Sequence, residues 1–183
     1  MKKKIFLAIA VIIIALVGYV AYLMLTTRNH SPAETVAHND NGLNVSISYC
    51  RPYKKDRVIF GTKEENALQP YGIYWRTGAN EATEITFDED VIFNGETIEA
   101  GTYSFYTFPG EKEWTVALNS VTGEWGYSEP DYSKEIHRSK VLADKPDSTI
   151  EQFTINYEPQ DNHVNVVLAW DNALVKIPVS PAS

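Results

Sequence analysis

The chain has 183 residues, with 16 Lys or Arg against 24 Asp or Glu and a formal net charge of −8. Lys2, Lys3 and Lys4 precede a long apolar run, so the rest of the chain has 13 bases and a net charge of −11. This charge argues against nucleic acid as a partner. The single cysteine, Cys50, excludes an intrachain disulfide framework and a multi-cysteine metal site.

Residues 5–25 form an uncharged, apolar run of 21 residues. As a helix rising about 1.5 Å per residue, the run would reach about 31 Å, close to the hydrocarbon thickness of a bilayer. The apolar part of a cleavable signal peptide is shorter, about 7–15 residues, and ends at a small-residue cleavage site. We therefore predict one uncleaved transmembrane anchor over residues 5–25, with a cleaved secretory signal as the alternative.

The charges on either side of the anchor predict its orientation. Three lysines lie before it and Arg28 alone follows closely, so the positive-inside rule places residues 1–4 in the cytoplasm as a basic tip. Residues 5–25 would then bind the lipid bilayer, and the rest of this single-pass chain would be periplasmic or extracellular. Residues 26–42 are polar and show no apolar period, which predicts a tether.

From residue 43 to residue 180 the dominant pattern is an alternation of apolar and polar side chains, which is typical of half-buried strands. The dipeptide Asn94-Gly95 predicts a tight hairpin turn, because both residues tolerate positive φ. Only residues 133–141 have room for a helical turn or two. We predict an all-β fold, a single antiparallel β-sandwich or flattened barrel over residues 43–180. The predicted strands cover residues 43–49, 84–87, 91–93, 97–99, 102–108, 114–118, 153–157, 164–170 and 175–179.

The sequence lacks the common catalytic and metal-binding motifs. It contains no HExxH, CxxC, Gly-rich phosphate loop or GxSxG elbow. We predict no metal site and no cofactor, and no catalytic residue can be named. Cys50 ends an alternating strand and is expected to be a small buried hydrophobe. The histidines are far apart in the sequence and are expected at the surface: His30, His38, His137 and His163.

One segment, residues 49–76, departs from the acidic character of the chain. It has six basic and three acidic residues, a net charge of +3, and it is rich in tyrosine. Arginine binds carboxylate or phosphate through its planar fork and stacks on aromatic rings, so the segment is a candidate groove for an anionic or sugar-like ligand. In the alternative, structural interpretation, Arg51 and Arg57 pair with carboxylates, and Arg76 pairs with Glu81 or Glu84.

Several strings in the chain resemble one bacterial family. They are YCRPYKKDRVIFG, PYGIYWRTGANEAT, AGTYSFYTFP, EWTVALN and WG, and the resemblance extends from about residue 31 to residue 179. The family is domain of unknown function 2911, whose members are typically exported or envelope-anchored and carry no established activity. It usually has serine where this chain has Cys50 and glycine where it has Asp56. The motif positions that the resemblance singles out for a shared ligand site are Arg51, Arg57, Trp75, Arg76, Asn80 and Glu81.

These features predict a membrane-anchored module of the bacterial cell envelope that binds a ligand or an envelope protein partner. The alternative is a hydrolase of an envelope polymer, because two carboxylates about 5–10 Å apart can hydrolyse a glycosidic bond. Glu81, Glu84 and Glu124 are the acidic residues considered for that role. The binding or interaction module is preferred, and the question of catalysis stays open.

Overall fold

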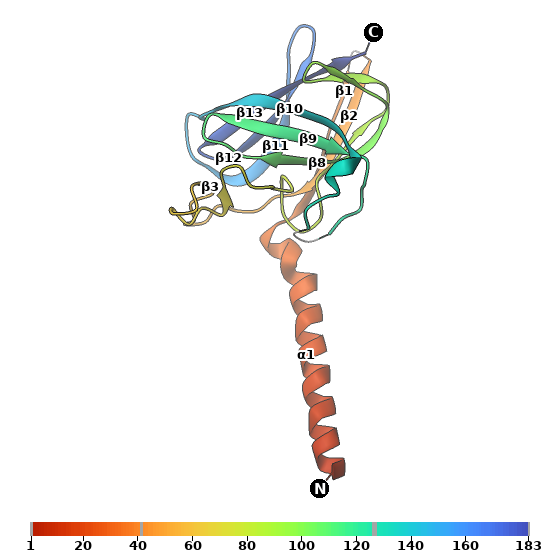
Figure 1. Cartoon of the computed structure of the whole chain (residues 1–183), viewed down its shortest axis with the longest axis vertical. Helices are drawn as coiled ribbons and strands as arrows, with labels where there is room; N and C mark the ends of the chain where they lie inside the picture. Colours follow the sequence, from red (N-terminus) through yellow and green to blue (C-terminus); the bar gives the residue numbers. More distant parts are fainter. Residues whose placement is uncertain (1, 41, 126–127, 183) are drawn as a thin grey trace.

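The computed structural model describes residues 2–40, 42–125 and 128–182 and shows one long helix attached to a β domain (Figure 1). The helix, α1 (Lys2–His30), projects away from the domain, and its described apolar side chains are largely exposed. Within it, Ile9–His30 is long and apolar enough to cross a membrane or to act as a signal sequence. The predicted apolar helix at the N-terminus is therefore confirmed.

Most of the segment predicted as a polar tether, residues 26–42, has regular structure instead: residues 26–30 are helical and residues 33–40 form a strand. α1 continues through His30, and strand β1 (Ala33–Asp40) pairs with the next strand over its whole length, from Ala33 opposite Cys50 to Asp40 opposite Leu43. None of the side chains of β1 is fully buried. Val36 packs against the core, but backbone pairing along the whole strand contributes most of its contacts, so no apolar period marks it in the sequence. Residues 1, 41, 126 and 127 of the predicted segments lie outside the described residues.

The strands that follow form one antiparallel sheet in the order β1-β2-β5-β8-β9-β10-β13-β12-β11. Strand β6 pairs with β13 and with β7, and the Asn94-Gly95 turn joins β6 to β7 as predicted, with φ angles of 46° and 92°. A separate parallel pair, β3 and β4, lies in the segment that follows β2. The bounds are β2 (Leu43–Cys50), β3 (Phe60–Gly61), β4 (Gln69–Pro70), β5 (Glu84–Phe87), β6 (Val91–Phe93), β7 (Glu96–Ile98), β8 (Gly101–Phe108), β9 (Glu113–Asn119), β10 (Glu135–Asp144), β11 (Ile150–Pro159), β12 (Val164–Asp171) and β13 (Ala173–Pro181).

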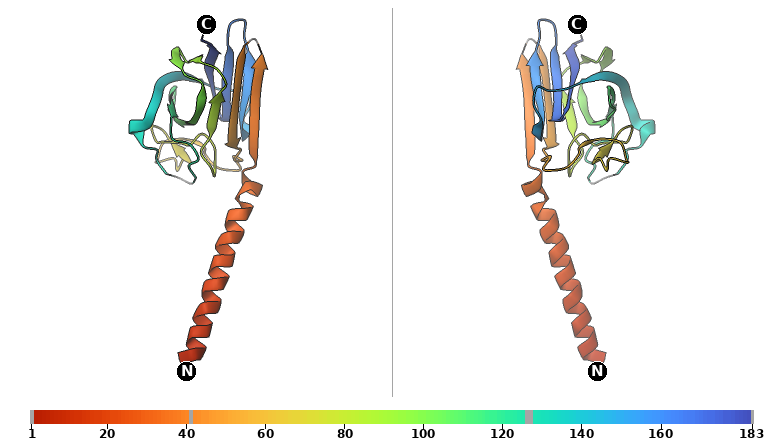
Figure 2. Two further views of the ribbon diagram at one scale, coloured as in Figure 1. Left: turned by 90° about the vertical axis from the view of Figure 1, so that its right-hand side faces the viewer. Right: turned by 90° about the vertical axis from the view of Figure 1, so that its left-hand side faces the viewer.

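The two edge strands of the sheet, β1 and β11, lie next to each other, so the sheet nearly closes into a flattened barrel (Figure 2). The ring of His38 on β1 is 5.7 Å from that of Tyr157 on β11. Just beyond the end of β2, the N–H of Phe153 in β11 donates to the carbonyl of Pro52 at 2.9 Å. The predicted all-β, antiparallel fold is confirmed, and its form is that of the flattened barrel.

The interior of the barrel is apolar and strongly aromatic. Alternate residues of the predicted strands point inward, as the period of two requires, and they form one continuous core cluster. The bulkiest of its fully buried side chains are Trp75, Trp170, Phe87, Phe93, Phe105 and Phe153.

Strand β10 was not predicted. Residues 133–141 hold a short 3₁₀ turn over Tyr132–Lys134 and then enter this long strand, instead of forming helical turns. His137 on β10 is only 3% exposed, so its predicted surface position is wrong. Its two ring nitrogens lie 2.7 Å from a carboxylate oxygen of Glu96 and 2.7 Å from Oγ of Ser139. His137 can be buried because both ring nitrogens have hydrogen-bond partners. As a polar residue at an inward-facing position it interrupts the apolar alternation, so the pattern does not predict the strand.

Candidate functional site

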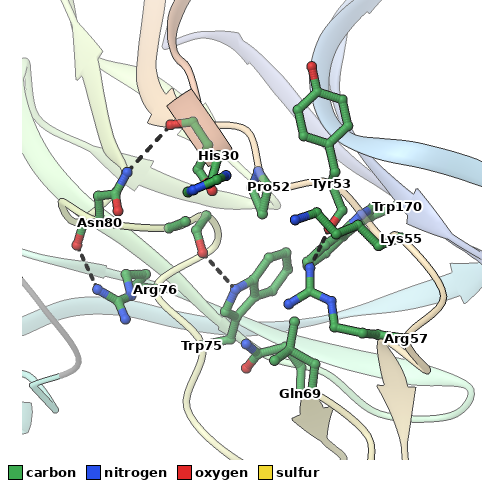
Figure 3. A pocket seen from close by; sticks show the side chains of 14 residues that line it. His30, Pro52, Tyr53, Lys55, Arg57, Gln69, Trp75, Arg76, Asn80 and Trp170 are labelled. Atoms are coloured by element: carbon green, nitrogen blue, oxygen red, sulfur yellow. Dashed lines mark hydrogen bonds between the residues drawn. The ribbon is translucent and has the colours of Figure 1, made fainter. Parts of the chain in front are cut away.

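A cavity of about 520 Å³ opens at the end of the barrel where α1 joins the domain (Figure 3). We call it the basal cavity. His30 at the end of α1, the segment after β2, the loop after β4 and β12 all contribute to its wall. The residues that line it include His30, Tyr53, Lys55, Arg57, Trp75, Arg76, Asn80 and Trp170.

The loop over residues 76–80 shapes one side of the basal cavity. Thr77 and Asn80 have φ angles of 54° and 58°, so the loop turns sharply there. Gly78 lies against the end of β2, since a Cβ at this position would be 3.0 Å from the carbonyl oxygen of Cys50. The hydroxyl of Thr83 donates to the carbonyl of Thr77 at 2.7 Å and closes the loop on itself. These contacts present Arg76 and Asn80 to the cavity.

The floor of the basal cavity is part of the aromatic core. Trp75 is 2% exposed and Trp170 is 1% exposed, and their rings are stacked with centroids 5.7 Å apart. Nε1 of Trp75 donates to the carbonyl of Gly78 at 3.1 Å, which ties the loop to the core. Nε1 of Trp170 is also buried and has no hydrogen-bond partner among the described residues. Trp75, expected to contact a ligand, therefore supports the cavity mainly from below.

Three cationic side chains line the basal cavity: Lys55, Arg57 and Arg76. Arg57 is exposed and donates to the carbonyl oxygens of Tyr53 and Lys54, the latter at 3.0 Å. No carboxylate lies within ion-pair distance of Arg57 among the residues that the structure describes. The structure therefore does not show the pairing of Arg57 with a carboxylate that the structural interpretation predicted.

Arg76 is partly buried, and its Nη1 donates to the carbonyl of Asn80 at 2.6 Å. This bond within the loop holds the guanidinium at the wall of the cavity (Figure 3). Asn80 in turn donates through its side-chain amide to the carbonyl of Ser31 at 3.4 Å. Arg76 and Asn80 therefore link the loop, the cavity and the residues directly after α1.

Arg51, another predicted site residue, lies outside the basal cavity. Its guanidinium is 3.1 Å from a carboxylate oxygen of Glu34 on β1 and also donates to Phe153 and Thr154 on β11. For this arginine the structural interpretation holds, because the side chain joins the two edge strands of the barrel.

Glu81 lies in a second cleft, of about 320 Å³, which Arg28 of α1 and Cys50 of β2 also line. Its carboxylate accepts from Arg28 of α1 at 2.6 Å and from the thiol of Cys50 at 3.2 Å. Burial alone would raise the pKa of Glu81, but hydrogen bonds from its own N–H, Arg28 and Cys50 outweigh burial and hold it below the usual range. Burial and the bond to Glu81 raise the pKa of the Cys50 thiol. Cys50 is buried, as predicted.

The second cleft gathers four glutamates, and we call it the acidic cleft: Glu34, Glu81, Glu84 and Glu124. Two of these carboxylates accept hydrogen bonds that stabilise the fold. Glu34 accepts from the hydroxyl of Tyr49 at 2.6 Å, and Glu84 accepts from the N–H of Gly123 at 2.8 Å. Among residues 2–40, 42–125 and 128–182, no group of three His, Cys, Asp or Glu side chains is placed to hold a metal ion.

The structure thus brings four of the six predicted site residues to one cavity and leaves two outside it. Those inside are Arg57, Trp75, Arg76 and Asn80; Arg51 and Glu81 are elsewhere. Sequence reasoning did not assign His30 or Trp170 to the site. His30 was placed in a tether, and nothing in the sequence of β12 marks Trp170 as different from the other inward-facing residues.

Comparison with known proteins supports the resemblance noted in the sequence. No curated protein and no solved structure matches the chain. One family model matches residues 31–179, which includes all of β1 to β12, most of β13 and the lining of both clefts except His30 and Arg28. Because this match covers well over half of the chain, the protein belongs to the family described as protein of unknown function (DUF2911).

Proposed function

We propose that the protein is a single-pass membrane protein whose β domain, on the periplasmic or extracellular side, binds an anionic or sugar-like ligand in the basal cavity. The observation that carries this proposal is that Lys55, Arg57 and Arg76 all line one cavity of a domain that is otherwise acidic. The anchor is supported by the length and composition of α1, and its orientation by the three lysines before the apolar run.

The dimensions and chemistry of the basal cavity suit a small ligand. Its volume of about 520 Å³ lies within the range typical of ligand sites, about 300–1,000 Å³. The guanidinium of Arg57 can present donors to a carboxylate or phosphate, and the ring of Tyr53, which is 37% exposed, offers an apolar face to a sugar. The site is expected to recognise its ligand through charge and ring contact together.

A thermal-shift screen of the full chain in neutral detergent tests this proposal. The probes are glucose 6-phosphate, glucuronate and inorganic phosphate, with glucose as the uncharged comparison. A ligand at 100 times its Kd stabilises a protein by about 2.7 kcal/mol, which gives a clear shift of the melting temperature. We expect an anionic probe to raise the melting temperature of the wild-type chain.

Two variants assign the effect to the cavity. The double substitution Lys55→Ala and Arg57→Ala is expected to abolish the shift. Lys63→Ala is the matched control, because Lys63 is exposed and lies in the same segment but does not line the cavity. Equal shifts in the double variant and the wild-type chain would remove the basal cavity as the binding site.

The hydrolase alternative is supported by one observation, the gathering of four glutamates in the acidic cleft. A glycoside hydrolase of the usual kind needs one carboxyl group with a raised pKa as the general acid. The pKa of Glu81 is shifted in the opposite direction, which weighs against it in that role. Release of reducing ends from peptidoglycan by the wild-type chain, and its loss in Glu124→Gln, would favour the hydrolase over the binding module.

The binding of an envelope protein partner stays a further prediction. A free strand edge is a common docking surface. Here β1 and β11, the ends of the main sheet, lie next to each other, and the side chains of His38 and Tyr157 are in ring contact between them. Because the two edges already contact each other, a partner has little free edge to which it could add a strand. Partner binding therefore has less structural support than ligand binding in the basal cavity.

A further inference from the structure

The basal cavity and the end of α1 form one structural unit. His30, the last residue of α1, lines the cavity, and the buried Ser31 follows it directly. Arg28 pairs with Glu81 at 2.6 Å, and Asn80 donates to the carbonyl of Ser31 at 3.4 Å. In Figures 1 and 2 the segment that carries the cavity lies at the same end of the domain as α1, while the C-terminus lies at the far end.

This arrangement sets the height of the cavity above a membrane that α1 spans. From Leu25, where the apolar run ends, to His30 the helix is continuous over five residues, which corresponds to about 7.5 Å. The polar headgroup layer on each side of the hydrocarbon is about 5–7.5 Å thick. The basal cavity would therefore lie at the level of the lipid headgroups, and no flexible linker separates it from them.

The surface around the cavity has the character of a membrane interface. Tyr53 and Leu68 line the cavity and are both exposed. Trp125 is 51% exposed and forms an isolated β-bridge with Glu81, the partner of Arg28. Tyrosine and tryptophan are enriched where a protein meets the headgroup layer, because their rings have an apolar body and a polar edge.

The charge of the segment that carries the cavity favours the same orientation. Residues 49–76 have a net charge of +3, whereas the rest of the chain after Lys4 has a net charge of −14. An anionic leaflet attracts basic groups close to its surface and repels acidic ones. The backbone N–H of Lys55 donates to the carboxylate of Glu151 at 2.8 Å, but its ammonium group has no ion-pair or hydrogen-bond partner among the described residues. The guanidinium of Arg57 donates only to backbone carbonyls.

We propose that the basal cavity binds the phosphate-bearing headgroup of an anionic lipid in the leaflet where α1 ends. Lys55 and Arg57 face the phosphate, Arg76 adds positive charge from the opposite side of the cavity (Figure 3), and the ring of Tyr53 lies against the glycerol or sugar part of the headgroup. The inference rests on the proposed function, since it names the class of ligand for the same cavity. It also gives a role to the continuous helix between the anchor and the domain.

Hydrogen–deuterium exchange of the full chain in lipid nanodiscs tests this inference. One set of nanodiscs contains phosphatidylcholine alone, and the other contains phosphatidylcholine mixed with phosphatidylglycerol. We expect exchange at residues 52–57 and 76–80 to be slower in the anionic nanodiscs than in the neutral ones. The slowing should disappear in the Lys55→Ala and Arg57→Ala double variant and persist in Lys63→Ala.

A parallel measurement in neutral detergent separates the lipid inference from the proposed function. Soluble glycerol phosphate is added to the full chain, and its effect on the melting temperature is recorded. Stabilisation by glycerol phosphate, with identical exchange in the two kinds of nanodisc, would overturn the lipid inference and leave an anion site in place. Absence of both effects would overturn both proposals. Equal protection by neutral and anionic nanodiscs would mean membrane contact without headgroup recognition, and this also overturns the inference.

Discussion

Trp75 offers a direct test of the packing beneath the basal cavity. Its ring centroid lies 5.4 Å from that of Phe60, 5.0 Å from Phe153, 5.7 Å from Trp170 and 5.9 Å from Trp114. Trp75→Ala would leave a large void in this cluster. Replacing a buried tryptophan by alanine costs about 3–5 kcal/mol of unfolding free energy. Because a typical domain is stable by about 5–15 kcal/mol, this loss is a large fraction of the total.

A more conservative substitution measures the contribution of the Trp75 hydrogen bond separately from that of its packing. Trp75→Phe keeps an aromatic side chain but removes the donor to the carbonyl of Gly78, which lies 3.1 Å from Nε1. A buried acceptor left without its donor costs about 1–3 kcal/mol. We therefore expect Trp75→Phe to lie between the wild-type chain and Trp75→Ala in stability.

The single cysteine provides the assay. Cys50 is buried, so in a urea titration of the full chain in neutral detergent its labelling by a thiol reagent reports unfolding. The shift of the midpoint, multiplied by the slope of the transition, gives the change in free energy. Trp125→Ala is the control, because Trp125 is 51% exposed and surface changes usually stay within about 0.5 kcal/mol. A loss below about 1 kcal/mol for Trp75→Ala, or an equal loss for Trp125→Ala, would refute the assigned role of the aromatic floor.

Three further outcomes are expected. The thiol of Cys50, buried and with a raised pKa, should resist a bulky thiol reagent at pH 8 in the native chain and react fully in urea; rapid native reaction would contradict its burial. Gly78→Ala should destabilise the domain by about 1–3 kcal/mol in the same titration, because the new Cβ lies 3.0 Å from a backbone oxygen. Gly18→Ala in α1, with open space around it and outside the β domain, is its control and should leave the unfolding of that domain unchanged. Since the pKa of Glu81 is lowered in the folded chain, its contribution to stability is present above about pH 4.3 and is lost as pH falls through the lower, folded value. The melting temperatures of the wild-type chain and Glu81→Gln should therefore converge between pH 5 and pH 3, and a constant gap would show that the charge of Glu81 contributes nothing.

Local patterns in the sequence are sufficient for the long apolar helix and for the strands whose own side chains are buried. The run over residues 5–25 predicts the apolar helix, and the alternation in β2, β12 and β13 predicts those strands, because burial of every second side chain needs an apolar residue there. β1 and β10 escape prediction for two different reasons. β1 is held largely by main-chain pairing. In β10 the inward-facing position 137 is a histidine that is hydrogen-bonded to Glu96.

Only part of the candidate site could be predicted, because local sequence brings some of its residues together and long-range contacts place the others. Arg57, Trp75, Arg76 and Asn80 share one basic, aromatic segment that connects β2 to β5, so a single stretch of sequence brings them close together. Arg51 belongs to the same segment, yet closure of the barrel takes it to Glu34 and β11. No local pattern distinguishes an arginine that lines a cavity from one that joins two strands.

The sequence alone determined the apolar helix, the β character of the domain and the cationic segment, because each depends on residues near one another in the chain. The tertiary structure alone decided that β1 and β11 meet and that Trp170 lies under the loop after β4. It also decided that α1 continues without a tether to His30, at the wall of the basal cavity. These features depend on contacts between distant segments, and such contacts form only when the sheet closes and its core excludes water.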